Sequence, residues 1–177
     1  MRWQTAYIGL GSNLEQPWQQ IQKALRSIND TDGIKLVQVS PVYQSTALIL
    51  SDHPGIQHQP DYLNAVAEIQ TQLSADQVLQ TILNIELYQG RRRGASKGGA
   101  RTIDLDLLLY GESEIQTPVL TVPHPGLIER AFVVKPLHDI APMLVVPGHQ
   151  ISLASLVQSL DLSDLKVVHP PTVAGAS

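Results

Sequence analysis

The sequence predicts an α+β fold, a ferredoxin-like βαββαβ sandwich with C-terminal additions. Over the first 110 residues, strand-like and amphipathic helical segments follow one another in the order β, α, β, β, α, β. This split βαβ order packs helices on one face of a mostly antiparallel sheet. With 177 residues, 43% of them hydrophobic, the chain can bury a substantial core, and we expect one domain over residues 1–165.

The first three predicted elements are a strand, a helix and a second strand. Residues 6–10 form a short apolar run that ends at Gly11, which indicates a buried strand followed by a turn. Pro17 suits the first turn of a helix, and the apolar residues after it recur at helical spacing. Residues 34–43 are rich in β-branched side chains, which favours a second strand.

A long loop separates these elements from the second half of the pattern. Residues 46–60 contain two prolines and no sustained periodicity, so we expect a surface loop that is functional or mobile. Residues 62–70 alternate as a strand does. Ser74 and Gln77 then form a capping-box pattern, which predicts a helix that ends near Gly90.

The remaining segments continue the pattern beyond the core. Residues 103–110 form an acidic strand, and prolines punctuate the chain after it. Short helices are predicted over residues 131–140, despite an internal proline, and over residues 151–160. Residues 166–177 are expected to form a flexible tail.

Composition excludes several classes of protein. A net charge of −4 argues against a general binder of polyanions, so any nucleotide binding must be local and nucleic acid is not an expected partner. The absence of cysteine excludes disulfides, thiolate nucleophiles and thiolate-bound metals. No signal peptide or membrane-spanning run is recognisable. We expect a cytoplasmic, monomeric enzyme with no membrane partner.

The acidic strand carries the clearest chemical signal. Asp104 and Asp106 stand two residues apart, so in a strand they share one face at a spacing of about 6.6 Å. Ile103, Leu105 and Leu107 would then enter the core. Two converging carboxylates repel each other unless a cation lies between them, and Mg²⁺ is commonly held by one or two carboxylates plus substrate phosphates. The alternative is an ordinary solvated strand face.

A glycine-rich cationic loop, residues 90–100, precedes this strand. Arginines supply bidentate contacts to phosphate oxygens, and a lysine supplies a mobile point charge. The loop does not fit the pattern of a Walker A loop. The alternatives are a solvated basic patch or a contact with RNA. Five of the twelve Lys and Arg residues fall in and beside the loop: Arg91, Arg92, Arg93, Lys97 and Arg101.

Two further groups of residues suit recognition of a ligand. His124, fixed between two prolines, could donate to a phosphate, with Arg130 adding charge and Phe132 an aromatic face. Tyr62 and Asn64 share one face of a predicted strand, where an aromatic ring beside an amide could stack on a flat heterocycle and bond to its edge. The alternatives are a structural histidine, a core phenylalanine and a simple cap on the sheet.

Together these residues resemble the 6-hydroxymethyl-7,8-dihydropterin pyrophosphokinase family of the folate pathway. Further family-like segments occur in family order between about residues 5 and 143, among them YIGLGSNL from Tyr7 and QPDYLNAV from Gln59. Three departures are Gly98, where many relatives have tryptophan, Val119, near a position where some have arginine, and a loop before Gln59 that is longer than in compact members. The core signature is met by Lys97, Gly99, Ala100, Arg101, Asp104, Leu105 and Asp106.

The resemblance implies transfer of pyrophosphate from ATP to the hydroxymethyl oxygen of the pterin, with release of AMP. It implies that Asp104 and Asp106 hold two Mg²⁺ ions and act in catalysis with Arg91, Arg93 and Arg101. Residues implied at the nucleotide are Glu86, Arg91, Arg93, Lys97, Arg101, Leu107, Thr121, His124 and Arg130. Residues implied at the pterin are Thr46, Ala47, Leu48, Tyr62, Asn64 and Phe132.

Two other functions fit part of the pattern. An RNA-binding module on a ferredoxin-like sheet would use the cationic loop, but the acidic strand carries Asp104 and Asp106 where stacking rings would be needed. A different ATP-dependent kinase acting on a small heterocyclic alcohol would use the same carboxylates and arginines.

Overall fold

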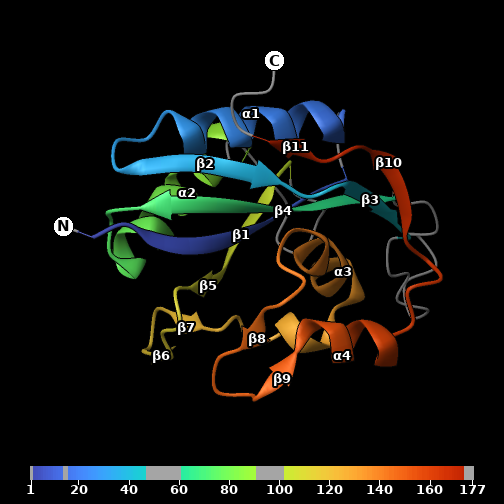
Figure 1. Cartoon of the computed structure of the whole chain (residues 1–177). Coiled ribbons are helices and arrows are strands. Elements are labelled where there is room, and N and C mark those ends of the chain that lie inside the picture. The colour runs from blue at the N-terminus through green and yellow to red at the C-terminus, as the bar shows by residue number, and fades with distance from the viewer. Residues whose placement is uncertain (1, 14–15, 47–60, 91–101, 174–177) are drawn as a thin grey trace.

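The computed structural model describes residues 2–13, 16–46, 61–90 and 102–173. A seven-stranded antiparallel sheet forms the centre of this part of the chain (Figure 1). Along its main path the strands lie in the order β10-β3-β4-β1-β5, while β2 pairs with β4 and β11 pairs with β2. The strands are β1 (Gln4–Ser12), β2 (Ile34–Val39), β3 (Val42–Ser45), β4 (Tyr62–Thr71), β5 (Asp104–Tyr110), β10 (Lys166–His169) and β11 (Thr172–Val173).

Helices cover both faces of the sheet (Figure 1). Helices α1 (Pro17–Asn29) and α2 (Ala75–Gln89) pack on one face, and α3 (Ala131–Ile140) packs on the other with α4 (Leu153–Ser159) against it. The predicted capping box begins α2, because the Ser74 and Gln77 side chains each bond to the other residue's backbone N–H. None of the helices in the described ranges has both the length and the apolar character needed to cross a bilayer.

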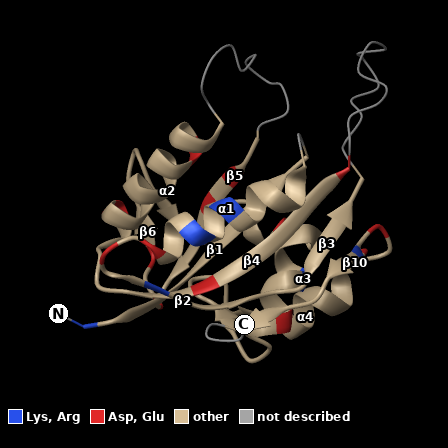
Figure 2. Cartoon of the chain, turned by 90° about the horizontal axis from the view of Figure 1, so that it is seen from above, with Lys and Arg blue, Asp and Glu red and all other residues tan. Residues whose placement is uncertain are grey.

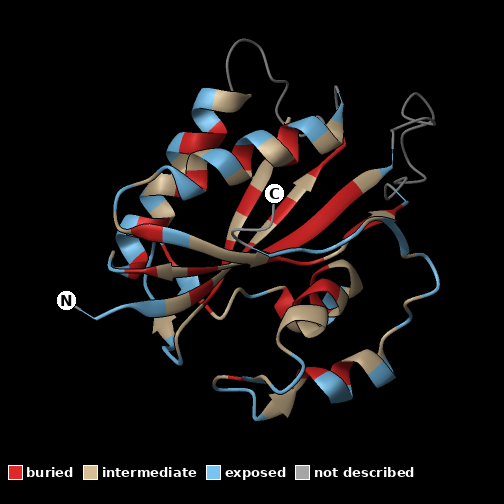
Figure 3. Cartoon of the chain, turned by 45° about the horizontal axis from the view of Figure 1, so that its top comes forward, coloured by how far each residue is buried: buried red, intermediate tan, exposed pale blue. Residues whose placement is uncertain are grey.

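The core consists of two clusters, one on each face of the sheet (Figure 3). The larger cluster joins inward residues of β1, β4 and β5 to Ile21 and Ile28 of α1 and to Val78 and Ile82 of α2. The smaller cluster includes Val134 of α3 and residues of α4. The alternation predicted for residues 62–70 is confirmed, since the odd-numbered side chains of that segment lie in the larger cluster.

Shorter elements follow β5 and complete the second layer. They are β6 (Ile115–Gln116), β7 (Thr121–Val122), the 3₁₀ turn η1 (Leu127–Glu129), β8 (Val145–Val146) and β9 (Ile151–Ser152). The helix predicted over residues 131–140 is confirmed as α3, and it contains Pro136. The helix predicted over residues 151–160 is shorter, because Ile151 pairs with Val146 and the Ser152 side chain caps α4.

The strand predicted over residues 34–43 is wrong as a single element, because it breaks between β2 and β3. Pro41 has no N–H to donate to a ladder. At the break, the Ser40 N–H bonds to the Val66 carbonyl at 2.9 Å, and the Ser40 hydroxyl oxygen accepts the Val66 N–H at 2.9 Å. The Ser40 hydroxyl thus takes the place of a backbone carbonyl as the acceptor for the Val66 N–H of β4.

Residues 166–173, the described part of the tail that was predicted to be flexible, contain two strands. β10 pairs with β3, and β11 pairs with β2. Pro170 and Pro171 lie between these strands, opposite the Ser40–Pro41 break, so the prolines fall where no ladder bonds are needed. The ring of His169 also stacks on Trp18 of α1, with centroids 4.0 Å apart.

We predict that Ser40→Ala lowers the free energy of unfolding by about 1–3 kcal/mol, because the buried Val66 N–H loses its acceptor. Ser113→Ala is the matched control. Ser113 is exposed, and its backbone N–H donates to the Tyr110 carbonyl, a bond that alanine keeps. It should stay within about 0.5 kcal/mol of the wild type. Chemical denaturation measures both values, and equal values for the two variants would contradict the role of Ser40.

We predict that the alternate amide protons of β10 that donate to β3, which include one of the two consecutive residues Lys166 and Val167, exchange at least about tenfold more slowly than in an unstructured peptide. Hydrogen exchange followed by NMR tests this at Lys166 and Val167. Exchange at the unstructured rate throughout residues 166–169 would support the flexible tail instead.

Candidate active site

Asp104 and Asp106 lie on one face of β5, as the alternation predicts. Both are partly exposed, whereas Leu105 and Leu107 between and after them are only 4% and 3% exposed. The two leucines enter the cluster beneath α1 and α2. The carboxylates therefore face the other side of the sheet, where α3 packs.

Two glycines of β1 leave room in front of these carboxylates. Gly9 pairs with Asp106, and Gly11 pairs with Asp104. On its other side, Gly11 pairs with Asn64 of β4. Because glycine has no side chain, the sheet is hollow between the buried amide and the two acids.

A bulge in β5 follows the acidic residues. Tyr7 pairs with Leu109 but Ile8 pairs with Leu107, so Leu108 is the extra residue. Asp106 and Leu108 share one face of the strand by ordinary alternation and line the same cavity. The bulge places the consecutive residues Leu108 and Leu109 together in the smaller core cluster, while Leu107 stays in the larger cluster on the opposite face.

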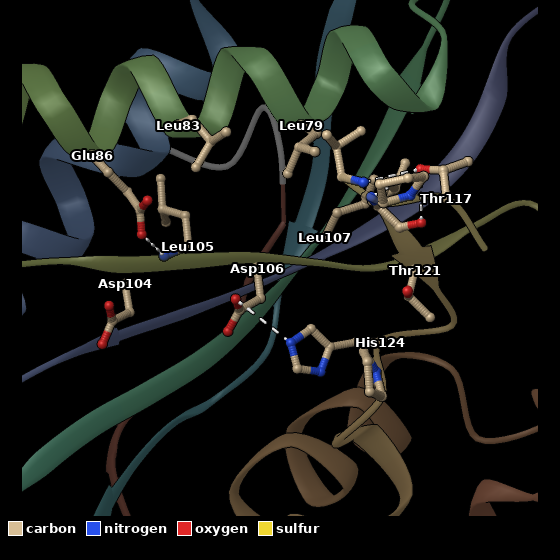
Figure 4. Close-up of a pocket in the computed structure, with 14 residues that line it drawn as sticks. Leu79, Leu83, Glu86, Asp104, Leu105, Asp106, Leu107, Thr117, Thr121 and His124 are labelled. Carbon is tan, nitrogen blue, oxygen red and sulfur yellow. Dashed lines mark hydrogen bonds and ion pairs between the residues drawn. The ribbon is translucent and has the colours of Figure 1, made fainter. Parts of the chain in front are cut away.

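The outer edge of β5 is closed by two other segments (Figure 4). The carboxylate of Glu86, which is 4% exposed on α2, accepts the Leu105 N–H at 2.9 Å. Farther along, the His124 N–H donates to the Leu108 carbonyl at 3.0 Å. In the described sheet β5 is the last strand, so these bonds satisfy groups that would otherwise face an open edge.

His124 faces Asp106 with a defined tautomer. Its Nδ1 accepts the Gly126 N–H at 3.1 Å, so the ring proton belongs on Nε2, which lies 3.7 Å from Asp106 Oδ1. Burial lowers the pKa of His124, Asp106 opposes this effect, and Arg130 lowers the pKa further. The imidazole is therefore neutral near pH 7 and presents an N–H donor beside the carboxylate.

The first cavity, of about 400 Å³, lies between β5 and α2 (Figure 4). Its volume falls within the usual range for small-molecule sites. Of the residues predicted at the nucleotide, it contains Glu86, Leu107, Thr121 and His124, together with Asp104 and Asp106. Val119, the residue near the position of a family arginine, also lines it.

The second cavity, of about 670 Å³, lies between the sheet and the start of α3. Of the residues predicted at the pterin, it contains Thr46, Tyr62, Asn64 and Phe132. Asp104 and Asp106 line this cavity as well as the first. The two carboxylates therefore stand at the boundary where the two cavities meet.

Arg130 lies apart from the other described residues predicted at the nucleotide. Arg130 was predicted with the nucleotide residues, but it lines the second cavity, with its guanidinium 6.0 Å from the centre of the Phe132 ring. Arg130 is the N-cap of α3 and has an extended backbone, and Phe132 is the second residue of that helix. The predicted residues Ala47, Leu48, Arg91, Arg93, Lys97 and Arg101, and the departure at Gly98, lie outside the described residues.

Sequence reasoning missed several residues of the second cavity. Gly9 and Gly11 form part of its lining, and glycine inside a strand is a known sign of a close approach by another group. Asp161, Asp164 and Leu165 reach the cavity from the C-terminal end. No local pattern marked them, because their position depends on strand pairing with a distant segment.

Acidic residues outnumber basic ones in the described linings of both cavities. Figure 2 marks the Asp and Glu residues of the chain in red and the Lys and Arg residues in blue. The first cavity has the carboxylates of Glu86, Asp104 and Asp106, and its described residues include no lysine or arginine. Asp104 and Asp106 suit a hard cation by their oxygen donors and by the open space over the two glycines. In the part of the chain that the structure describes, no cluster of three or more potential metal ligands occurs.

Comparison with known proteins agrees with the resemblance in the sequence. The family model for 7,8-dihydro-6-hydroxymethylpterin-pyrophosphokinase (HPPK) matches residues 7–142. A 2-amino-4-hydroxy-6-hydroxymethyldihydropteridine pyrophosphokinase from Haemophilus influenzae is 44% identical over 92% of this chain and 98% of its own length. The protein of that name from Pseudomonas aeruginosa is 44% identical over 81% of this chain and 85% of its own length.

Solved structures share the fold at low sequence identity. A Plasmodium falciparum HPPK-DHPS matches with a TM-score of 0.70 and 12% identity, over 94% of this chain and 47% of that chain. An HPPK-DHPS in complex with substrates matches with a TM-score of 0.67, over 90% of this chain and 43% of that chain. This chain thus spans less than half the length of those structures, and they support its mixed fold of antiparallel sheet and helices.

The family model covers most of the chain, and the two bacterial relatives are matched over most of their own lengths. This chain therefore belongs to the 7,8-dihydro-6-hydroxymethylpterin-pyrophosphokinase family of folate biosynthesis enzymes.

Proposed function

We propose that this enzyme transfers the terminal pyrophosphoryl group of ATP to the hydroxymethyl oxygen of 6-hydroxymethyl-7,8-dihydropterin, giving the pterin diphosphate and AMP. The observation that carries this proposal is the meeting of two ligand-sized cavities at Asp104 and Asp106. A reaction between two bound substrates needs two adjacent sites that share one set of charged groups. The family membership supports the same reaction.

The nucleotide is assigned to the first cavity and the pterin to the second. Tyr62 and Phe132 offer aromatic faces to a flat ring, and the buried amide of Asn64 can bond to its edge. Leu79, Leu83 and Leu107 give the first cavity an apolar wall suited to a purine base. In this assignment Arg130 acts from the pterin side, near the transferred phosphates.

Asp104 and Asp106 would hold Mg²⁺, in the two-ion arrangement expected for the family. When bound, Mg²⁺ neutralises phosphate charge and polarises the phosphorus centre under attack. The acidity of the described lining supports this assignment, because polyphosphate would otherwise be repelled by three carboxylates. The cations predicted from the sequence, Arg91, Arg93, Lys97 and Arg101, stay proposals for the same role.

His124 is assigned the role of a neutral hydrogen-bond donor to a phosphate oxygen. Its Nδ1 is occupied by the Gly126 N–H, so only Nε2 can donate, and Nε2 points toward the carboxylate that borders both cavities. The chain offers alignment and charge for the transfer and uses no covalent nucleophile. Such alignment supplies most of the catalysis in phosphoryl transfer.

We also infer that the core topology is ferredoxin-like. Counting β2 and β3 as one interrupted strand, the elements β1, α1, β2/β3, β4, α2 and β5 occur in the βαββαβ order. Strand β4 lies between β2/β3 and β1, and β5 lies beyond β1. This antiparallel order supports the split βαβ arrangement expected from the sequence.

We predict that incubation with ATP, Mg²⁺ and the hydroxymethyl dihydropterin yields AMP and the pterin diphosphate in equal amounts, because the pyrophosphoryl group moves as one unit. Chromatography of the nucleotides with mass spectrometry of the pterin measures both products. Formation of ADP would indicate a different kinase reaction, and turnover that does not require the pterin would contradict the proposed substrate.

We predict that Asp104→Asn and Asp106→Asn each lower kcat/KM by about 10²–10³-fold, because each loses a charge that binds Mg²⁺ and serves both substrates. The melting temperature should change little, since both side chains face a cavity. Glu112→Gln is the control, because this exposed carboxylate lines neither cavity. Wild-type kinetics in either aspartate variant would exclude that residue from the metal site.

A further inference from the structure

The C-terminal segment, residues 161–169, reaches the second cavity and makes a two-point contact there. The Asp164 carboxylate accepts the Thr46 N–H at 2.9 Å through Oδ2 and the Thr46 hydroxyl at 2.6 Å through Oδ1. Both oxygens are therefore engaged by a single residue that is 118 positions away in the sequence. A paired contact of this kind fixes orientation as well as distance.

Two local features hold Asp164 in position. On its N-terminal side, Asp161 Oδ1 accepts both the backbone N–H and the hydroxyl of Ser163, which closes a turn. On its C-terminal side, Lys166 and Val167 begin β10 and pair with Gln44 and Tyr43 of β3. Asp164 thus stands between a closed turn and a paired strand.

Thr46 connects this contact to the ligand-facing side chains. It directly follows Ser45, whose hydroxyl oxygen accepts the Asn64 side-chain N–H at 2.8 Å. Ser45 also pairs with Tyr62 across β3 and β4. Thr46, Asn64 and Tyr62 all line the second cavity. A shift of Thr46 would therefore move the adjacent Ser45, and with it Asn64 and Tyr62, the two side chains assigned to the pterin.

The contact also limits what Thr46 can offer to a ligand. Asp164 takes both hydrogen-bond donors of Thr46, the backbone N–H and the hydroxyl. The carbonyl oxygen is the remaining backbone polar group of that residue. In this arrangement Thr46 serves the ligand as an acceptor, which suits the donor-rich edge of an aminopyrimidinone ring.

We propose that Asp164 is a positioning residue for the acceptor substrate: it holds Thr46 and Ser45 so that Asn64 and Tyr62 face the pterin. This inference rests on the proposed function of the second cavity. Asp164 itself is exposed, and bonds from Thr46 hold the pKa of its carboxyl below the usual value, so the contact persists at neutral pH. It would be lost only as the pH falls through that lowered pKa.

Steady-state kinetics of the full chain test the proposal. Asp164→Ala should raise the KM for 6-hydroxymethyl-7,8-dihydropterin about three- to tenfold, the effect of one or two lost hydrogen bonds. Its kcat and its KM for ATP should stay within about twofold of the wild type, because Asp164 lines only the second cavity. Asp164→Asn keeps one acceptor oxygen and should fall between the wild type and the alanine variant.

Two further variants separate the hydrogen bonds from general charge effects. Thr46→Val removes the hydroxyl, and combining it with Asp164→Ala should give less than the product of the two single effects, because both remove the same contact. Glu112→Gln removes a carboxylate that lines neither cavity and should leave all constants unchanged. An equal rise in pterin KM for Glu112→Gln would indicate a charge effect and overturn the proposal.

The same measurements distinguish this inference from the proposed function. An unchanged pterin KM in an active Asp164→Ala enzyme would overturn the positioning role alone, and so would equal losses toward ATP and pterin. Absence of pterin-dependent turnover in the wild type would overturn the proposed function. In that case, hydrogen exchange of the Thr46 amide still decides whether Asp164 holds Thr46: exchange should be at least about tenfold faster in Asp164→Ala.

Discussion

The pairing of two glycines on β1 with two aspartates on β5 is the constraint that opens the second cavity beside the carboxylates that both cavities share. Gly9 lies beside Asp106 and Gly11 beside Asp104, so no side chain of β1 fills the space over the carboxylates. Larger residues would fill the hollow: a Cβ on Gly11 would lie 3.2 Å from the Asn64 oxygen. The glycines cost some strand stability, since glycine loses more backbone entropy than other residues. In return, the space above the glycines stays open beside Asp104 and Asp106, which line both cavities.

The position of the two carboxylates depends on how β5, the last strand of the described sheet, is held, and α2 provides the first restraint. Glu86 lies in the first cavity, yet the Leu105 N–H occupies one of its carboxylate oxygens. The residue is therefore part of the framework that holds β5 as well as part of the lining. The His124 backbone bond to Leu108 provides a second restraint, and the same residue brings its Nε2 toward Asp106. Glu86 and His124 thus both bond to backbone groups on the open edge of β5 and line the first cavity.

Local patterns in the sequence predicted what depends on neighbours along the chain. Alternation identified the face of Asp104 and Asp106, and Ser74 with Gln77 identified the start of α2. Features that depend on distant partners were missed. The Ser40 break is explained only by Val66, and pairing of the C-terminal strands requires the edges of β2 and β3. Arg130 matched a family motif, but the motif does not show which cavity it lines. In the structure Arg130 is the N-cap of α3 and lines the second cavity.

The break at Ser40 and Pro41 lies in the edge segment of the sheet that leads to the second cavity. A continuous strand would present one long edge, whereas β2 and β3 present two short edges. β11 covers the edge of β2, and β10 covers the edge of β3. The covering segment is interrupted at Pro170 and Pro171, opposite the break at Ser40 and Pro41. β10 pairs with β3, and Asp164, just before β10, accepts the Thr46 N–H. A segment that protects a sheet edge is thereby also in contact with the wall of a ligand cavity. In this chain, the pairing of β10 with β3 both covers an edge of the sheet and brings Asp164 to the wall of the second cavity.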